Sequence, residues 1–382
     1  MKFNYVNPTQ ILFGQNQISA ISEQIAPESK VLVIYGGGSI KSNGVYDQVT
    51  SALKNHNWVE FSGVEPNPTR ETLDKAVALV RSENVDYILA VGGGSVIDGS
   101  KYVAAAAMYD GEGWDIPAGK HQVTQAVPLG SILTLPATGS ESNGGSVISN
   151  AATKEKLAFM SPLVQPRFAV MDPDVMKTLP DRQLVNGVVD AWVHVCEQYL
   201  TTVNNAYVQD GYAEVLLRSL LKLGGDFDKR DSDEWRANLM WSANQALNGL
   251  IGVGVAQDWA THMIGHELTA AFGVDHARSL AIVQPSLMRN QLATKRGKLE
   301  QMGVNVFGLA QSDDLAERTI EAIESFYQGL GVATQLTDYG LTAEQAVDKI
   351  TAQIESHGLL ALGEHQAITL TESRKILEAA IQ

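Results

Sequence analysis

Four short apolar runs in the first 173 residues, each followed by a glycine or proline turn, constrain the fold of this chain most strongly. The runs are VLVIY (31–35), YILAV (87–91), AVPLGSILTLPA (126–137) and RFAVMD (167–172). Helical patterns separate them, such as the segment from Thr69 to Arg81. Continuous apolar strands that alternate with helices are typical of a mostly parallel sheet covered on both faces. We therefore predict a Rossmann-like α/β domain in the first part of the chain.

Beyond Leu179-Pro180 the strand-like runs almost vanish. Long helical patterns with few prolines continue from there to Gln382, and no internal repeat or low-complexity segment interrupts them. The sequence thus predicts two domains, an α/β domain over residues 1–178 and an all-α domain over residues 179–382.

The charge balance excludes two classes of partner. The chain carries 28 Lys+Arg and 43 Asp+Glu, for a formal net charge of −15, so nucleic acid and anionic membrane surfaces repel it. No apolar stretch approaches the roughly 18 residues of a membrane helix. The single cysteine, Cys196, rules out an intramolecular disulfide, and the opening MKFNYVNPTQ lacks the apolar run of a signal peptide. We expect a cytoplasmic protein.

Two glycine turns, Gly36-Gly37-Gly38-Ser39 and Gly92-Gly93-Gly94-Ser95, follow the first two strands directly. Glycine lets the backbone approach a ligand closely, and the amides at the start of the next helix can bind an anion. The second turn precedes a clear helical pattern, so it is a candidate pyrophosphate cradle. A tight turn that serves packing alone is the alternative, because the text is not the Gly-x-Gly-x-x-Gly fingerprint.

The first turn bears on the choice between NAD and NADP. Sites selective for NAD place a carboxylate at the ribose 2′-hydroxyl, whereas this turn is followed by Ser39 and Lys41 with no carboxylate nearby in the sequence. A 2′-phosphate would meet no repulsion here, and Ser39 and Lys41 could bind it. The alternative is that Lys41 is a solvated surface residue.

A helical pattern over residues 188–199 carries polar residues on an otherwise apolar helix. Asp190, His194 and Glu197 fall on one side at helical spacing, while Cys196 points elsewhere. A helix that is apolar almost all round is buried, so this strip needs partners or a metal.

A second helical pattern, from Ala256 to Phe272, spaces Asp258, His262 and His266 four residues apart, and His276 follows shortly after. Together the two helices offer ample nitrogen and oxygen ligands for a divalent metal. The pattern is not His-Glu-x-x-His, because Met263 follows His262. Spacing leaves open whether His262 or His266 is a ligand, and whether Asp258 or Glu197 takes part.

Several motifs in one order resemble the iron-containing, group III alcohol dehydrogenases, in particular the branch of NADPH-dependent aldehyde reductases and butanol dehydrogenases. The resemblance extends over essentially the whole chain. Besides the block from His262 to His276, its motifs are PTQILFG (8–14), VEPNPT (64–69), GGGSVID (92–98), TLPATGSE (134–141) and GVVDA (187–191).

This resemblance implies which residues act. The implied ligands of one divalent metal, Fe²⁺ or Zn²⁺, are Asp190, His194, His262 and His276, with His266 beside the metal. The NAD-preferring branch has an aspartate at the position of Gly37, which favours NADP(H) here. The residues then expected to contact the cofactor are Gly37, Ser39, Lys41, Gly93, Gly94, Ser95, Asp98, Thr134, Thr138 and Lys156. The chain departs from the family at Asp275-His276-Ala277, where much of the family has Pro-His-Gly, which puts the loop geometry in question.

The implied activity is hydride transfer from NADPH to short-chain aldehydes to give primary alcohols, with His266 as candidate proton relay and a homodimer as the assembly. One alternative is a metal- and NAD-dependent cyclase or lyase of the dehydroquinate synthase type. Such sites need several basic residues near the metal, and Arg278 is the only one close to the histidine block. The other alternative is a binding protein that keeps the fold without catalysis.

Overall fold

The computed structural model of the protein describes residues 2–203 and 205–381. The chain divides into two compact units. The α/β unit contains Val6–Pro180 and Asp231–Asn244, and the helical unit contains Met1–Tyr5, Asp181–Arg230 and Gln245–Gln382. The boundary at residue 178 remains a prediction about where one domain ends and the next begins.

The α/β unit is built on a six-stranded sheet with the strand order β1-β8-β5-β4-β2-β3. Every neighbouring pair is parallel. The strands are β1 (Gln10–Phe13), β2 (Lys30–Tyr35), β3 (Asn57–Phe61), β4 (Tyr87–Gly92), β5 (Leu129–Leu133) and β8 (Phe168–Met171). The four predicted runs are β2, β4, β5 and β8, which occupy the interior of the sheet and are buried along almost their whole length. They read as continuous apolar runs because helices cover both faces.

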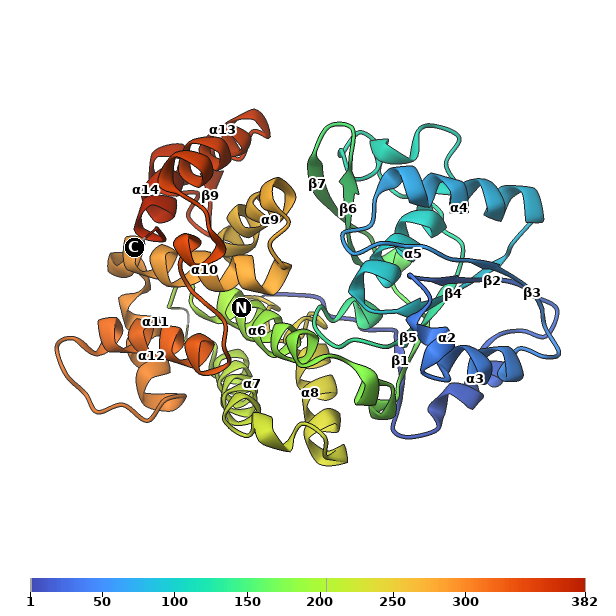
Figure 1. Cartoon of the computed structure of the whole chain (residues 1–382), viewed down its shortest axis with the longest axis horizontal. Coiled ribbons are helices and arrows are strands. Elements are labelled where there is room, and N and C mark those ends of the chain that lie inside the picture. Colours follow the sequence, from blue (N-terminus) through green and yellow to red (C-terminus); the bar gives the residue numbers. More distant parts are fainter. Residues whose placement is uncertain (1, 204, 382) are drawn as a thin grey trace. The chain divides into compact units, whose positions relative to one another are not determined.

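The helices of this unit lie on both sides of the sheet, with α4 and α5 on one side and α2 and α3 on the other (Figure 1). Their bounds are α1 (Ile21–Gln24), α2 (Ser39–Ser42), α3 (Val45–Ala52), α4 (Arg70–Glu83) and α5 (Gly94–Ala106). Thr69 begins α4 by accepting a hydrogen bond from the Thr72 amide, which places the start of this helix where the sequence predicts it. An antiparallel hairpin, β6 (Gly145–Asn150) and β7 (Glu155–Met160), packs on α5.

Most of helix α8 (Asp233–Ala246) also belongs to the α/β unit. The Asn244 side chain donates to Glu141 Oε1 at 2.8 Å and to Ser142 Oγ at 2.7 Å. Trp241 packs edge-on against Phe13 of β1, with ring centroids 5.7 Å apart. These contacts join a late segment of the chain to the unit formed by its first part.

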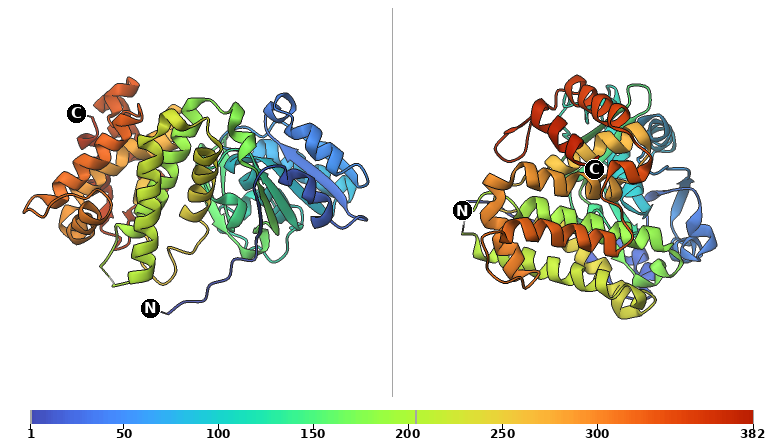
Figure 2. Two further views of the ribbon diagram at one scale, coloured as in Figure 1. Left: turned by 90° about the horizontal axis from the view of Figure 1, so that it is seen from below. Right: turned by 60° about the vertical axis from the view of Figure 1, so that its left-hand side comes forward.

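The helical unit is centred on α10 (His276–Asn290), which contacts α6, α9, α12 and α14. The other helices are α6 (Asp181–Tyr199), α7 (Tyr207–Gly225), α9 (Ala260–Phe272), α11 (Leu292–Asn305), α12 (Leu315–Gly329), α13 (Lys349–Ser356) and α14 (Leu370–Ala379). The orange and red part of the chain in Figure 2 is almost entirely helical. Its only strands among the described residues are the two-residue strands β9 (Ala361–Leu362) and β10 (Ile368–Thr369).

The predicted fold class is confirmed, a parallel α/β unit followed by a mostly helical part. The small β9–β10 hairpin is the one correction to the all-helical prediction. In the part of the chain that the structure describes, no helix has both the length and the apolar character that a membrane crossing requires.

Candidate active site

Three side chains of the helical unit converge on one point. Asp190 and His194 lie one turn apart on α6, and His262 comes from the first turn of α9. All three are buried, and one ligand atom from each lies within 4.8 Å of the others. Asp190 Oδ1 is 3.7 Å from His194 Nδ1 and 3.9 Å from His262 Nε2. The helices α6 and α9 both pack on α10, which brings two segments far apart in the sequence together.

His276, the first residue of α10, reaches the same carboxylate. Its Nε2 atom is 3.7 Å from Asp190 Oδ1, and its ring lies 5.3 Å from the ring of His262. His266 is partly exposed, one turn beyond His262, and its ring centroid is 5.0 Å from that of His276. The structure thus gathers all four residues predicted as ligands, with His266 at the side of the group.

The donor set fits a divalent metal. Three imidazoles and one carboxylate are ligands that iron and zinc both accept. Metal bonds of about 2.0–2.2 Å to nitrogen and oxygen separate neighbouring ligand atoms by about 3–4 Å, and the distances to Asp190 Oδ1 fall in that range. A buried carboxylate among imidazoles is costly without such compensation.

The structure resolves the two carboxylates that spacing left open. Glu197 Oε2 accepts a hydrogen bond from His262 Nδ1, so Glu197 binds the back of the imidazole. Asp258 turns away, and its Oδ2 atom pairs with Lys295 Nζ at 2.6 Å. The helix begins at Ala260 and not at Ala256, because Trp259 has left-handed backbone with φ of 65°. The predicted helix start at Ala256 is therefore wrong, and Asp258 lies before the helix that carries His262.

Asp275 ties the start of α10 to α6. Its Oδ2 atom accepts hydrogen bonds from Arg182 Nε at 2.6 Å and from Asn186 Nδ2 at 2.8 Å. Burial opposes the charge of this carboxyl, but the bonds from Arg182 and Asn186 prevail and lower its pKa. An ion pair thus restrains the loop before His276.

In the α/β unit, the two glycine turns lie side by side. The chain leaves β2 toward β3 on one side and later returns to place β4 on the other side, so β2 and β4 flank the switch point of the sheet. Tyr35 pairs in register with Val91, and each strand runs directly into its glycine turn. Ligands of open parallel sheets bind at the carboxyl ends of the strands at such a switch point. Only the strand order reveals this, because the turns are more than 50 residues apart.

The turn after β4 is closely packed and polar. A Cβ atom on Gly94 would meet Thr138 Oγ1 at 2.5 Å, and one on Gly93 would meet Leu135 Cβ at 3.1 Å. The Thr134 amide donates to Gly92 O at 3.0 Å, so Thr134 and Thr138 both border this turn. These glycines therefore permit a close approach that no side chain could allow.

A loop and a hairpin add two more of the predicted cofactor residues to this turn. Ser95 Oγ accepts from the Asn67 amide at 3.3 Å, and Asn67 Oδ1 accepts from Lys156 Nζ of β7 at 2.9 Å. The loop of residues 64–69 thus connects the start of α5 with the β6–β7 hairpin. Ser95 and Lys156 lie near each other through Asn67, which the sequence did not indicate as a site residue.

Asp98 faces the hairpin through a polar network. Its carboxylate accepts from Ser140 Oγ at 2.5 Å and from the Val147 amide at 2.9 Å. Lys101, fully buried one turn later on α5, donates to Ser140 Oγ, Asn143 Oδ1 and Gly145 O. Burial raises the pKa of Asp98 and lowers that of Lys101 to about 8. The network joins α5 to the hairpin at the edge of the candidate cofactor site.

The turn after β2 lies near a carboxylate of the neighbouring strand. Lys41 Nζ lies 3.6 Å from Glu60 Oε1 of β3 and 4.6 Å from the ring centroid of Tyr46. A carboxylate that is distant in the sequence lies near this turn, because β3 pairs beside β2 and brings Glu60 to it. Tyr35 and Tyr46 both donate to Glu60 Oε2, at 3.1 and 2.8 Å. Gly37 itself has open space where a Cβ atom would lie.

A sheet with glycine turns at its switch point, together with a helical unit that carries a metal-ligand group, is typical of metal-dependent dehydrogenases that use a nucleotide cofactor. Residues 8–173 match the family described as iron-containing alcohol dehydrogenase. Residues 184–381 match the C-terminal part of the Fe-containing alcohol dehydrogenase family. The chain belongs to the iron-containing alcohol dehydrogenase family.

Individual relatives agree with this assignment. The chain is 50% identical over 384 residues to the NADPH-dependent aldehyde reductase YqhD of Escherichia coli (strain K12), covering 99% of each chain. It is 42% identical over 362 residues to the NADH-dependent butanol dehydrogenase A of Clostridium acetobutylicum, covering 91% of this chain and 93% of that one.

Solved structures show the same similarity. The crystal structure of YqhD from E. coli K-12 superposes with a TM-score of 0.97 at 49% identity, covering 99% of this chain and 98% of that one. The NADH-dependent butanol dehydrogenase A of Thermotoga maritima gives a TM-score of 0.94 at 38% identity, covering 100% of this chain and 99% of that one. Nothing in these matches supports the alternative of a dehydroquinate synthase-type enzyme.

Proposed function

We propose that this protein is a metal-dependent aldehyde reductase that uses NADPH and forms primary alcohols from short-chain aldehydes. The reaction is reversible, so the protein also oxidises alcohols. The observation that carries this proposal is the convergence of Asp190, His194 and His262 in a chain of the alcohol dehydrogenase family. The group is buried and has the donor chemistry of a catalytic metal site.

The proposed ligands are Asp190, His194, His262 and His276. When bound, a divalent metal supplies Lewis-acid polarisation of a carbonyl oxygen, and a reduced nicotinamide supplies the hydride. The four side chains would hold the metal. His266 holds a proton on its imidazole at the exposed side of the group and delivers it as the alcohol forms. The metal is Fe²⁺ or Zn²⁺, and elemental analysis of the purified protein distinguishes them.

The proposed cofactor site is the pair of glycine turns. Gly93, Gly94 and Ser95 at the start of α5 receive the pyrophosphate. The other proposed contacts are Asp98, Thr134, Thr138 and Lys156 around the same turn, and Gly37, Ser39 and Lys41 at the turn after β2. Support for NADPH comes from the absence of a side chain at Gly37 and from the cation of Lys41, which a 2′-phosphate could attract away from Glu60. The 50% identical E. coli relative is named as NADPH-dependent.

Two further features belong to this proposal. They are a homodimeric assembly and a cytoplasmic location. The family resemblance supports them, together with the single cysteine and the acidic net charge. Light scattering of the purified protein tests the first, and cell fractionation tests the second.

The decisive experiment follows NADPH consumption by the metal-loaded protein with a panel of short aldehydes, with NADH in parallel. We expect fast turnover with NADPH and little with NADH. Turnover that is equal or faster with NADH contradicts the cofactor assignment and leaves the reductase standing. No turnover with either cofactor contradicts the function itself and moves the interpretation to a binding protein.

A further inference from the structure

A carboxylate supports the imidazole of His262 from behind. Glu197 of α6 is buried and accepts three N–H groups from the start of α9. Its Oε1 atom accepts from the Thr261 amide at 2.7 Å. Its Oε2 atom accepts from the His262 amide at 3.3 Å and from His262 Nδ1. Both oxygens of one carboxylate are therefore used as acceptors.

With Glu197 ionised, this arrangement fixes the position of a proton on His262. When the Glu197 carboxylate accepts from Nδ1, the imidazole carries its proton on Nδ1 and leaves the lone pair on Nε2. It is Nε2 of His262 that faces Asp190, at 3.9 Å. Glu197 also accepts the backbone amides of Thr261 and His262 at the start of α9, where helix amides lack partners within the helix.

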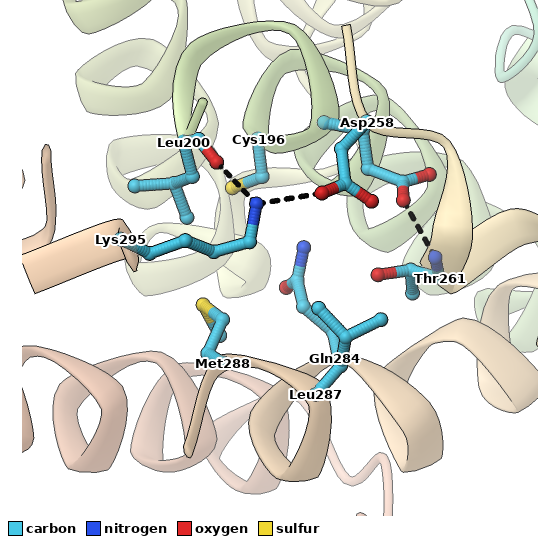
Figure 3. A pocket seen from close by; sticks show the side chains of 9 residues that line it. Cys196, Leu200, Asp258, Thr261, Gln284, Leu287, Met288 and Lys295 are labelled. Atoms are coloured by element: carbon cyan, nitrogen blue, oxygen red, sulfur yellow. Dashed lines mark hydrogen bonds and ion pairs between the residues drawn. The ribbon is translucent and has the colours of Figure 1, made fainter. Parts of the chain in front are cut away.

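A second carboxylate and a buried lysine hold the segment in place. The Asp258 amide donates to the Glu197 carbonyl at 2.9 Å, and Asp258 Oδ1 accepts from the Ala260 amide at 2.9 Å. Lys295 Nζ, from α11, pairs with Asp258 Oδ2 at 2.6 Å and donates to the Leu200 carbonyl at 2.7 Å. Figure 3 shows Lys295 among the residues that line a pocket, with its Nζ atom close to Leu200 and Asp258. Its positive charge offsets the carboxylates of Asp258 and Glu364, the second with its Oε2 atom 3.2 Å from Nζ, whose mutual repulsion would otherwise oppose this packing.

We propose that Glu197 is a positioning residue for the metal site, which holds the proton of His262 on Nδ1 and thereby presents Nε2 to the metal, with the Asp258–Lys295 pair keeping its acceptor geometry in place. Partners that bind the far nitrogen of a ligating histidine fix its tautomer and its orientation, and their loss lowers metal affinity by about 10- to 100-fold. This inference rests on the metal site of the proposed function.

Glutamine in place of Glu197 separates the roles of shape and charge. Its amide has one acceptor oxygen and one NH₂ donor, whereas the surrounding Thr261 amide and His262 Nδ1 both require acceptors. If the oxygen faces the Thr261 amide, the NH₂ faces Nδ1, which must then accept. The proton of His262 moves to Nε2, and the atom meant for the metal is blocked.

The experiment measures the affinity of the full chain for Zn²⁺ by competition with a chromophoric chelator, in wild type, Glu197→Gln and Glu214→Gln. Glu214 is the matched control because it is a buried carboxylate of the same unit, which accepts from Tyr199, Gln301 and Asn305. We expect Glu197→Gln to weaken zinc binding at least tenfold and Glu214→Gln to change it less than threefold. The visible absorption spectrum of the Co²⁺-loaded protein is expected to change in the first variant alone.

Zinc affinity of Glu197→Gln within threefold of wild type overturns the proposal, and so does an equal loss in both variants. If wild type itself binds no zinc or cobalt, the metal site of the proposed function fails, which is a different result. Should Glu197→Gln not fold, nitrogen NMR of histidine-labelled, metal-stripped wild type decides. A protonated Nδ1 and a bare Nε2 on His262 support the proposal, and the opposite tautomer overturns it.

Discussion

His262 and His266 lie one helical turn apart on α9, yet their surroundings give them different chemistry. His262 is buried, its Nδ1 binds Glu197 and its Nε2 faces Asp190. His266 is partly exposed and contacts the rings of its two neighbouring histidines, with centroids 6.1 Å from His262 and 5.0 Å from His276. Burial and a fixed tautomer suit a ligand, whereas an imidazole with access to solvent suits proton transfer.

Replacing each of these histidines with glutamine therefore separates metal binding from turnover. We expect His262→Gln to abolish both the bound metal and the reductase activity. We expect His266→Gln to keep the metal and to lower kcat by about 10²-fold or more, the range of general acid catalysis. Metal content by elemental analysis and steady-state kinetics on both variants check this. Equal loss of metal in the two variants contradicts the role of His266.

Lys101 is expected to make the free energy of unfolding depend on pH, and the sign of this dependence follows from the burial of the lysine. Burial lowers the pKa of this lysine from 10.5 to about 8 in the folded protein, despite the attraction of Asp98 and Glu141. Between pH 8 and 10.5 the unfolded chain binds more protons at this position than the folded chain does. The free energy of unfolding therefore rises with pH over this range. Below pH 8 the lysine is charged, and burial of that charge opposes folding. This unfavourable contribution disappears as the lysine loses its proton.

We expect the difference in unfolding free energy between wild type and Lys101→Met to shift in favour of wild type across this pH range, by at most about 3 kcal/mol. Urea unfolding at pH 7.5 and pH 10 measures it. Lys75→Met, at an exposed position on α4, serves as the control and is expected to show no such shift. A shift in the opposite direction contradicts the assignment.

At the scale of elements, the metal-ligand group depends on how three helices are joined. Two ligands share α6, one lies in the first turn of α9, and one begins α10. The starts of the two later helices are tied to α6 by carboxylates. Glu197 of α6 binds the first turn of α9, and Asp275 before α10 binds Arg182 and Asn186 of α6. The site therefore depends on these ties as well as on its ligands.

Asp275→Ala tests the second tie. Without the carboxylate, the start of α10 is less restrained, and we expect zinc affinity to fall by about tenfold. The loss of unfolding free energy is expected to be about 1 kcal/mol, because Arg182 is largely exposed and its ion pair is screened. Chelator competition and urea unfolding measure the two effects. Asp313→Ala, at an exposed position, is the control, and zinc affinity unchanged by Asp275→Ala contradicts the tie.

At the scale of the whole molecule, each of the two units carries the site proposed for one bound group, either the metal or the cofactor. The four proposed metal ligands all belong to the helical unit, and both glycine turns belong to the α/β unit. A ligand that binds only the folded state raises stability by mass action. Metal and cofactor are therefore expected to stabilise different units.

Removal of the metal should accordingly destabilise the protein. We expect treatment with a chelator to lower the unfolding free energy, and zinc at 1,000 times its Kd to restore about 4 kcal/mol. Thermal unfolding followed by circular dichroism, with and without zinc, measures this. His262→Gln is the control that should not respond to zinc. A wild-type protein whose unfolding is unaffected by chelator and by zinc contradicts a structural contribution of the metal.

The sequence predicted the interior strands better than the edge strands. The runs that became β2, β4, β5 and β8 are buried on both faces and are apolar throughout. The strands β1 and β3 lie at the two edges of the sheet, where half-exposed positions dilute the apolar pattern. The sequence did not predict them, because no continuous run marks them.

What the sequence determined by itself is local. Apolar periodicity, glycine turns and histidine spacing predicted the fold class and a metal site, because each of these signals spans only a few turns of chain. The choice of Asp190, His194 and His262 among the candidate ligands came from the family resemblance. Tertiary structure decided the rest. Strand order placed Glu60 beside Lys41. Helix packing brought Glu197 into contact with His262 and Lys295 into contact with Asp258. Most of α8 packs in the α/β unit. Such contacts join residues dozens or hundreds of positions apart, and only burial in a common core selects which of them pair.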